Sequence, residues 1–374
     1  MLEIRRMPNP FRPRQQGENG RPHLQGIRSL DAIIYPMLRP RFLFFALLSL
    51  TLAAPAQPSP AYRYFRVGNQ SNAASTSRPG FALMGGGADL DEAFRFLCDR
   101  AGSGDLLVLR ATSGDDYNPY IQKLCHLNSV ATILIPNRDA AADPFVEQII
   151  HHASALFISG GDQANYINFW QGTPVQAALN DAVRRGVPVG GTSAGLAVLG
   201  EFAYTAQGDK PDDPNLDGKT ALADPFGPRI TLNRDFLEIP ILKGIITDTH
   251  FARRDRMGRL LVFLARLNEP DGKVLPPPGL NTRGIGVEQG AAVLLEPDGK
   301  ATVVGHGSAY FVDPSGATGV LAIGKPLSFG IFVVQKVAPG HVFDLKAWTG
   351  DSTQYKLSVE AGVIHSTQPG GGVY

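Results

Sequence analysis

The sequence predicts an α/β fold: a doubly wound, mostly parallel sheet with helices on both faces, followed by a β-rich C-terminal segment. Two observations support this prediction. Between residues 81 and 191, short apolar runs of strand length alternate with amphipathic stretches of helix length. The apolar runs are continuous rather than alternating, which is typical of strands that are buried on both faces of a parallel sheet.

The predicted elements follow one another in a regular order. Strands are expected within 81–87, 105–112, 130–137, 155–161 and 187–191, and helices within 90–102, 117–128, 144–153 and 174–186. Each amphipathic stretch can cover one face of the sheet with its apolar side. Farther along, the polar stretch 205–228 predicts a loop and 257–266 predicts a helix. The later segments are short and β-rich, and we expect them to extend the same domain at one edge.

Glycines end three of the predicted strands, at 85–87, 160–161 and 190–191. Binding sites in open parallel sheets form beyond the carboxyl ends of the strands, so these ends are expected on one rim. The stretch GTSAG at residues 191–195 fits G-x-S-x-G, in which glycines allow a sharp strand-to-helix turn that exposes Ser193. Amides in the first turn after such a serine can bind negative charge developing on an oxygen, as acyl transfer requires. A glycine turn with an N-capping serine is the alternative.

Composition and charge narrow the class of protein. The 374 residues include 35 Lys and Arg against 34 Asp and Glu, and 43% are hydrophobic. This content supports a substantial core, and the lack of a broad positive field argues against a nucleic-acid partner. The glycines at 85–87 do not complete G-x-G-x-x-G, so no nucleotide cofactor is expected. Cys98 and Cys125 either form a disulfide or remain buried thiols.

The N-terminal region has the pattern of a secretory signal. After Met37 come two arginines, an apolar run at 42–52 and small residues before Gln57. The run is too short to span a membrane comfortably. We therefore expect a secreted or periplasmic protein without stable membrane association after cleavage, with an uncleaved anchor as the alternative.

Three separated motifs give the sequence a specific resemblance: Ser193 in GTSAG, ISGGDQ at 158–163 and DTHFARRDRMGR at 248–259. The sequence resembles the cyanophycinases, which belong to a family of serine peptidases that also holds aspartyl dipeptidases and has a class I glutamine amidotransferase-like fold. The resemblance spans residues 81–296. It implies hydrolysis of cyanophycin, a multi-L-arginyl-poly-aspartate, or of related β-aspartyl peptides through an acyl-enzyme. An aspartyl dipeptidase and a noncatalytic binding homologue are the alternatives, and a homodimer is a further implication.

The resemblance also assigns roles by position. It makes Ser193 the nucleophile and His250 its base, which suits the chemistry because a serine hydroxyl is a weak nucleophile until a base takes its proton. The amides of Gly161 and Ala194 would form the oxyanion hole. The residues placed around the substrate pocket are Asp162, Gln163, Asp248, Arg254, Arg256 and Arg259. Guanidinium groups match carboxylates, so we expect an acidic or β-aspartyl substrate; a solvated helix is the alternative for the arginines.

The sequence departs from the family pattern at two places. Thr249 stands where the family usually has Gln, and the family's DE after GIG is Glu288-Gln289 here. Gln289 then occupies the position of the triad acid. Either Gln289 orients His250 through a neutral hydrogen bond, or a one-residue bulge turns Glu288 inward.

The polar stretch also contains a candidate calcium loop. Its oxygen-ligand and glycine positions are Asp213, Asn215, Asp217, Gly218 and Asp224. Asp-rich turns that cap their own backbone are the alternative, and no other metal or cofactor is expected. The expected divisions of the chain are a disordered or misassigned extension at 1–36, a signal peptide at 37–56, a linker at 57–80, the hydrolase domain at 81–345, and a C-terminal β segment with a flexible tail at 346–374.

Overall fold

The computed structural model describes residues 60–112, 114–209, 212–213, 215–268 and 281–374. The chain divides into two units, Met1–Gln57 and Pro58–Tyr374, and the expected extension and signal peptide lie outside the described residues. Within the described part, no helix combines the length and the apolar character that crossing a membrane would require. The second unit contains every element discussed below.

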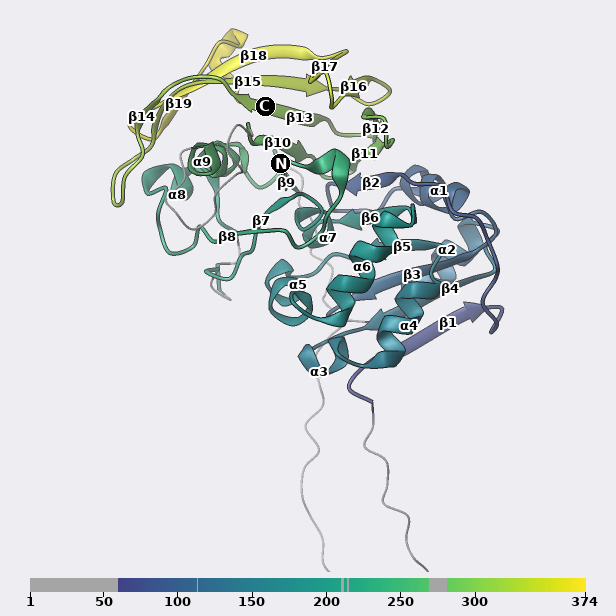
Figure 1. The fold of residues 1–374 in the computed structure, drawn as a ribbon. Helices are drawn as coiled ribbons and strands as arrows, with labels where there is room; N and C mark the ends of the chain where they lie inside the picture. The colour runs from purple at the N-terminus through teal and green to yellow at the C-terminus, as the bar shows by residue number, and fades with distance from the viewer. Residues whose placement is uncertain (1–59, 113, 210–211, 214, 269–280) are drawn as a thin grey trace, which may run out of the picture. The chain divides into compact units, whose positions relative to one another are not determined.

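The first sheet has ten strands in the order β1-β4-β3-β5-β6-β2-β11-β12-β16-β17 (Figure 1). Its strands are β1 (Arg63–Gly68), β2 (Phe81–Met84), β3 (Asp105–Arg110), β4 (Ser129–Leu134), β5 (Ala155–Ile158), β6 (Val189–Thr192), β11 (Ala291–Leu295), β12 (Lys300–Gly305), β16 (Val342–Asp344) and β17 (Thr349–Gly350). Strands β4, β3, β5, β6 and β2 pair in parallel, and β1 and β11 flank them in antiparallel register. The predicted parallel sheet is therefore confirmed for these five central strands, whereas β1, β11, β12, β16 and β17 extend it in antiparallel register.

Helices cover both faces of this sheet. They are α1 (Asp91–Arg100), α2 (Tyr117–Leu124), α3 (Arg138–Ala141), α4 (Pro144–His152), α5 (Gln163–Trp170) and α6 (Pro174–Arg184). Alternate residues of β3 belong to different cores: Leu106 and Val108 cluster with residues of α1 and α2, whereas Leu107 and Leu109 cluster with residues of α4, α5 and α6. Because successive side chains of a strand point to opposite faces, the continuous apolar run of β3 is explained by burial on both sides.

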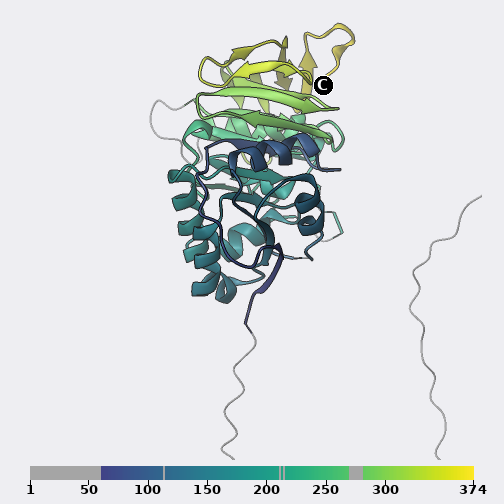
Figure 2. The ribbon, with the colours of Figure 1, turned by 90° about the vertical axis from the view of Figure 1, so that its right-hand side faces the viewer.

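The C-terminal part of the chain builds a second sheet in the order β19-β18-β15-β13-β10-β9-β7-β8, with β14 paired to β15 (Figures 1 and 2). Its strands are β7 (Phe202–Tyr204), β8 (Leu232–Arg234), β9 (Ile245–Asp248), β10 (Arg283–Val287), β13 (Ala309–Pro314), β14 (Thr318–Val320), β15 (Ser328–Val337), β18 (Thr353–Glu360) and β19 (Val363–Ser366). The expectation that all later segments extend one edge was therefore incomplete: β11, β12 and β16 do extend the first sheet, but β10, β13, β15 and β18 pair elsewhere.

The second sheet is also buried on both faces. On one face, Tyr310 and Val312 pack with α8 (Gly218–Ala223) and α9 (Met257–Asn268). On the other face, Ile285, Phe311 and Val337 belong to the same core cluster as the first sheet. Apolar packing between the two sheets thus fixes the strand ends of one against those of the other.

Two expected divisions differ from the structure. The expected linker at 57–80 contains β1, which pairs with β4, and Arg66 of β1 forms an ion pair with the nearly buried Asp105 at 3.1 Å. The expected flexible tail packs against the second sheet, where the Tyr355 hydroxyl donates a hydrogen bond to the Val373 carbonyl. A six-residue strand and a glycine-rich tail lack the long periodic pattern that would reveal their partners.

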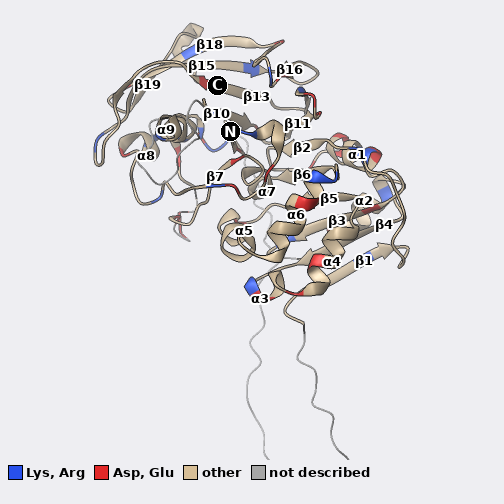
Figure 3. Ribbon diagram, viewed as in Figure 1, with Lys and Arg blue, Asp and Glu red and all other residues tan. Residues whose placement is uncertain are grey.

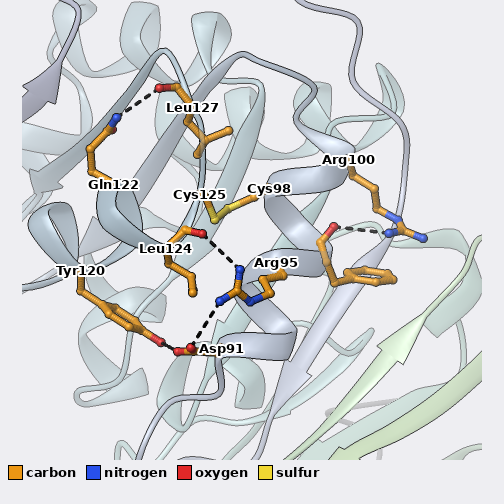
Figure 4. Close-up of a disulfide and its surroundings, with 10 residues drawn as sticks. Asp91, Arg95, Cys98, Arg100, Tyr120, Gln122, Leu124, Cys125 and Leu127 are labelled. Atoms are coloured by element: carbon orange, nitrogen blue, oxygen red, sulfur yellow. Dashed lines mark hydrogen bonds and ion pairs between the residues drawn. A yellow bond between two sulfur atoms is a disulfide. The ribbon is translucent and has the colours of Figure 1, made fainter.

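Cys98 and Cys125 form a disulfide that joins α1 to the residue following α2 (Figure 4). Close to it, the Arg95 guanidinium donates to the Leu124 carbonyl, which links the same two elements. Of the two alternatives that the sequence left open, the structure has the disulfide. Basic and acidic residues are interspersed along the elements rather than gathered by sign (Figure 3).

Candidate active site

Ser193 occupies a strained turn between β6 and the short helix α7 (Ala194–Ala197). Its φ of 52° and ψ of −118° are unfavourable for a residue with a Cβ atom, and such strain is characteristic of functional turns. Gly195 permits the turn, because a Cβ atom there would lie 2.0 Å from the Ile158 carbonyl oxygen. The strand-to-helix turn predicted from GTSAG is present.

His250 follows β9 and lies against Ser193. Its Nε2 atom is 2.7 Å from the Ser193 Oγ atom. Its backbone N–H donates to the Gly85 carbonyl at 2.7 Å, which ties the residue to the end of β2. Gly86 lies over the imidazole, since a Cβ atom at Gly86 would come within 2.5 Å of Nε2. Nucleophile and base therefore come from different sheets and meet at one rim.

The other ring nitrogen of His250 lacks a partner. The Nδ1 atom is buried and has no hydrogen-bond acceptor among the residues that the structure describes. Glu288 is engaged elsewhere: its carboxylate accepts from the Tyr310 hydroxyl at 2.5 Å and from the Ser308 N–H at 2.8 Å. Gln289 lies beside Gly87, where an added Cβ atom would be 3.0 Å from its Nε2 atom. Neither candidate for the triad acid bonds to the imidazole.

The surroundings of His250 keep its imidazole neutral. Burial lowers its pKa to about 4, and the positive charges of Arg254 and Arg256 lower it in the same direction. Asp248 opposes this shift but does not cancel it. At neutral pH the ring is thus unprotonated, the state in which it can accept the Ser193 proton.

Two of the three predicted pocket arginines are already paired with protein groups. The Arg259 guanidinium donates to both carboxylate oxygens of Asp248, and both side chains are almost fully buried. Arg256 is buried too, and it donates to the Thr249 carbonyl at 2.9 Å and to the Asn215 side chain. Both arginines are therefore buried and bound to protein groups next to the site, and neither is a solvated helix residue.

Arg254 differs from the other two. It is exposed, and its guanidinium has no hydrogen-bond acceptor or ion-pair partner among the described residues. Its backbone N–H donates to the His250 carbonyl at 2.9 Å, so it lies in the turn that starts at the base. Arg254 is the pocket arginine that is available to an acidic ligand.

The ISGGDQ motif lies opposite, at the end of β5. A Cβ atom on Gly160 would be 3.5 Å from the Ser193 Cβ atom, so this turn borders the nucleophile, and Gly161 has a φ of +154°. Asp162 caps α5 by accepting from the Ala164 N–H at 2.9 Å, and Gln163 donates to the Tyr204 carbonyl at 3.4 Å. As the first residue of α7, Ala194 has an N–H without an intrahelical acceptor.

The carboxylates of the candidate calcium loop do not converge. Asp213 forms an ion pair with Arg229 at 2.7 Å, Asp217 caps α8, and Asp224 accepts from the Phe226 N–H. Across the described part of the chain, no group of three or more His, Cys, Asp or Glu side chains is arranged to hold a metal ion. Capping and ion pairing account for these residues.

For three residues near the site, the sequence did not predict the role that the structure gives them. Gly86 covers the imidazole, Asn215 accepts from Arg256 and donates to the Arg254 carbonyl at 3.3 Å, and Tyr374 packs on Phe251. Gly86 belongs to a glycine run that predicts only a strand end. Asn215 and Tyr374 reach the site through tertiary contacts across 39 and more residues, which no local pattern encodes.

The chain is similar to known peptidases. Residues 83–224 match the model of peptidase family S51. A cyanophycinase from a Nostoc species (strain PCC 7120) is 30% identical over 187 residues, which are 49% of this chain and 53% of that protein. A cyanophycinase from Synechococcus elongatus is 26% identical over 261 residues, which are 67% of this chain and 73% of that protein.

The aligned part of this chain thus spans about half the length of the Nostoc relative. Among solved structures, a peptidase from an acI-B1 Actinobacterium aligns with a TM-score of 0.46 and 15% identity, over 72% of this chain and 98% of that one. The family match and the cyanophycinase relatives together show that this chain is similar to peptidases of family S51.

Proposed function

We propose that this protein is an exported serine peptidase that hydrolyses cyanophycin or related β-aspartyl peptides through an acyl-enzyme. The observation that carries the proposal is the 2.7 Å contact between the Ser193 Oγ atom and the Nε2 atom of a neutral His250. In the tautomer in which Nε2 accepts the serine proton, Nδ1 carries the ring hydrogen. The pair is therefore arranged for proton transfer during nucleophilic attack.

The reaction follows from these positions. His250 takes the Ser193 proton while Oγ attacks the scissile carbonyl, and the amides of Gly161 and Ala194 hold the resulting oxyanion. The imidazolium then gives its proton to the leaving amine, and the acyl-enzyme remains. Water, deprotonated by His250, hydrolyses this ester and restores the serine. Each oxyanion-hole donor of this kind contributes roughly 3 kcal/mol in the transition state.

The free guanidinium of Arg254 supports an acidic substrate. It lies in the same turn as the base and carries no protein carboxylate, whereas Arg256 and Arg259 are saturated. A guanidinium fork binds a carboxylate in a bidentate manner. Cyanophycin supplies such a group at the end of its aspartate backbone, and the relatives with 26–30% identity are named cyanophycinases.

Of the two candidates that would complete the triad, the contacts favour Gln289. Glu288 already accepts hydrogen bonds from Tyr310 and Ser308, so releasing it would leave a buried hydroxyl without an acceptor. Gln289 lies next to the glycines that cover the imidazole. In this proposal, the Gln289 amide orients His250 in the complex with substrate, as a neutral group can.

A pair of substitutions separates these candidates. If Gln289 orients the base, Gln289→Glu keeps or raises kcat and raises the pKa of His250, because a nearby negative charge favours the imidazolium. Gln289→Ala lowers kcat. If Glu288 were the acid instead, Glu288→Gln would lower kcat by about 10⁴ while Gln289→Ala would be mild. Circular dichroism establishes that each variant is folded.

Export is supported by the signal pattern at 37–56 and by the disulfide between Cys98 and Cys125, because disulfides persist in oxidising compartments. N-terminal sequencing of exported protein tests the proposal. A mature chain that starts near Gln57 agrees with signal cleavage, whereas a chain that keeps Met37 indicates an anchor.

The function is tested by incubating the mature protein with cyanophycin and with Asp-X dipeptides and identifying the products by mass spectrometry. Release of β-aspartyl-arginine supports the proposal, cleavage of dipeptides alone indicates an aspartyl dipeptidase, and binding without turnover indicates a noncatalytic homologue. Ser193→Ala is expected to abolish turnover. Ser77→Ala is the matched control, because Ser77 bonds to Ser154 just before β5, at the opposite end of the strands.

A further inference from the structure

Tyr374 makes directed contacts with the segment that leads from His250 to α9. Its hydroxyl oxygen accepts from the Met257 N–H at 2.9 Å, and the hydroxyl donates to an Asp255 carboxylate oxygen at 3.0 Å. Its ring packs edge-on against Phe251, with 5.9 Å between ring centroids, and against Tyr310 at 6.0 Å. These contacts bring together residues that are 117 and 119 positions apart in the sequence.

The hydroxyl acts as a cap for α9. Met257 is the first residue of this helix, so its N–H has no acceptor within the helix. Tyr374 supplies that acceptor from another part of the chain, and its hydroxyl donates a hydrogen bond to Asp255. Asp255 has a φ of 48° and lies two residues before the first residue of the helix, so the turn is held in an unfavourable conformation at this end.

The other end of the same turn is the base itself. His250 has a φ of 48°, and Phe251 follows it directly. Within the turn, the Arg254 N–H donates to the His250 carbonyl and the Arg256 N–H donates to the Phe251 carbonyl. Tyr374 thus contacts the turn at Phe251, next to the base, and at Asp255, next to the free Arg254.

We propose that Tyr374 is a positioning residue for the Ser193–His250 site: its hydroxyl and ring fix the turn of residues 250–256 that presents the base and Arg254. The proposal rests on the proposed function, because it concerns the same base. Tyr374 touches neither Ser193 nor the imidazole, so it acts through Phe251 and Asp255. Without it, the turn would relax, water would reach the imidazole, and the Oγ to Nε2 contact would lengthen.

The experiment compares Tyr374→Phe, Tyr374→Ala and the control Tyr120→Phe. The Tyr120 hydroxyl, on α2, donates to Asp91 of α1 at 2.6 Å. Two quantities are measured in each folded protein: kcat and KM on the substrate found above, and the pKa of His250 by NMR titration of its ring Cε1–H signal. We expect Tyr374→Phe to lower kcat about fivefold, the rate equivalent of one neutral hydrogen bond, with KM nearly unchanged. Tyr374→Ala lowers kcat further and raises the His250 pKa toward its ordinary value.

These measurements test the positioning role of Tyr374 separately from the proposed peptidase function. Unchanged kcat and unchanged His250 pKa in both Tyr374 variants overturn it, and so does lower thermal stability with both quantities unchanged at a temperature where the variants are folded. If the wild-type protein turns over no substrate, the proposed function fails. The NMR titration still answers whether Tyr374 controls the environment of His250, and Tyr120→Phe should move neither quantity.

Discussion

The buried ion pair between Asp248 and Arg259 next to the site allows a quantitative test of how much it contributes to the free energy of unfolding. The perturbation is Asp248→Asn, which keeps the shape of the side chain and removes its charge. Both oxygens of the carboxylate accept from Arg259, and the Arg256 guanidinium lies 3.6 Å away. The side chains of Asp248 and Arg259 are only 3% and 2% exposed, so the remaining guanidiniums cannot reach water.

The magnitude follows from this burial. Breaking a buried pair by removing one charge costs roughly 3–5 kcal/mol, since the other charge stays buried and uncompensated. A loss of this size is a large part of the total stability of about 5–15 kcal/mol that folded proteins have. An exposed pair contributes about 0–1 kcal/mol, which supplies the control. Asp99→Asn removes a pair with Arg78 in which both side chains are over 60% exposed, and a 3.9 Å contact with Arg100, which keeps its ion pair with Glu296.

The assay is urea denaturation of both variants and the wild type at neutral pH, followed by tryptophan fluorescence. We expect Asp248→Asn to lower the free energy of unfolding by about 4 kcal/mol and Asp99→Asn to leave it nearly unchanged. A loss below about 1 kcal/mol for Asp248→Asn would refute the reasoning, because it would mean that water solvates the pair in the folded protein.

Three further predictions concern the base, the disulfide and the glycine over the imidazole. Because burial and nearby arginines lower the His250 pKa to about 4, the acid limb of a kcat/KM profile should lie near pH 4, and a limb near 6.5 would contradict this assignment. The same shift means that the unfolded protein binds more protons between these pH values, so the free energy of unfolding should fall as pH drops from about 6.5 to 4. Replacing Cys98 and Cys125 together by Ser should cost about 3–4 kcal/mol of stability in denaturation experiments, since the disulfide closes a loop with a sequence separation of 27; equal midpoints would rule out a constraining disulfide. Gly86→Ala should displace the imidazole and lower kcat by at least tenfold while the protein stays folded, because the new Cβ atom would meet Nε2 at 2.5 Å; unchanged kcat would show that the ring does not lie against this backbone.

Local patterns predicted the first half of the fold well. The strand β3 and the helix α6 each have the composition and periodicity of a buried strand and an amphipathic helix, and both lie where expected. The turn at Ser193 was also predictable, because the glycine at 195 and the strained serine have a local cause. These features depend on neighbours within a few residues.

The remaining features depend on distant partners. Whether a short β-rich segment such as β10 joins the first or the second sheet is decided by pairing across the chain, and composition does not encode it. The arginine motif likewise shows four cations but not that Asp248 and Asn215 neutralise or bind two of them. The role of Tyr374 depends on contacts more than one hundred residues away, and a glycine-rich tail predicts flexibility instead.

Ser193 and His250 follow strands of different sheets, so the distance between them depends on how the two sheets pack against each other. A single sheet fixes its own residues through hydrogen bonds. The distance between Ser193 and His250 depends instead on apolar side chains such as Phe311, on the backbone bond from His250 to Gly85, and on the Thr247 hydroxyl, which donates to the Leu196 carbonyl at 2.8 Å. Substitutions that change the side-chain volume between the two sheets should therefore change kcat without altering Ser193 or His250. For the same reason, neither sheet alone holds both Ser193 and His250, so the pair can form only once the second sheet has packed against the first.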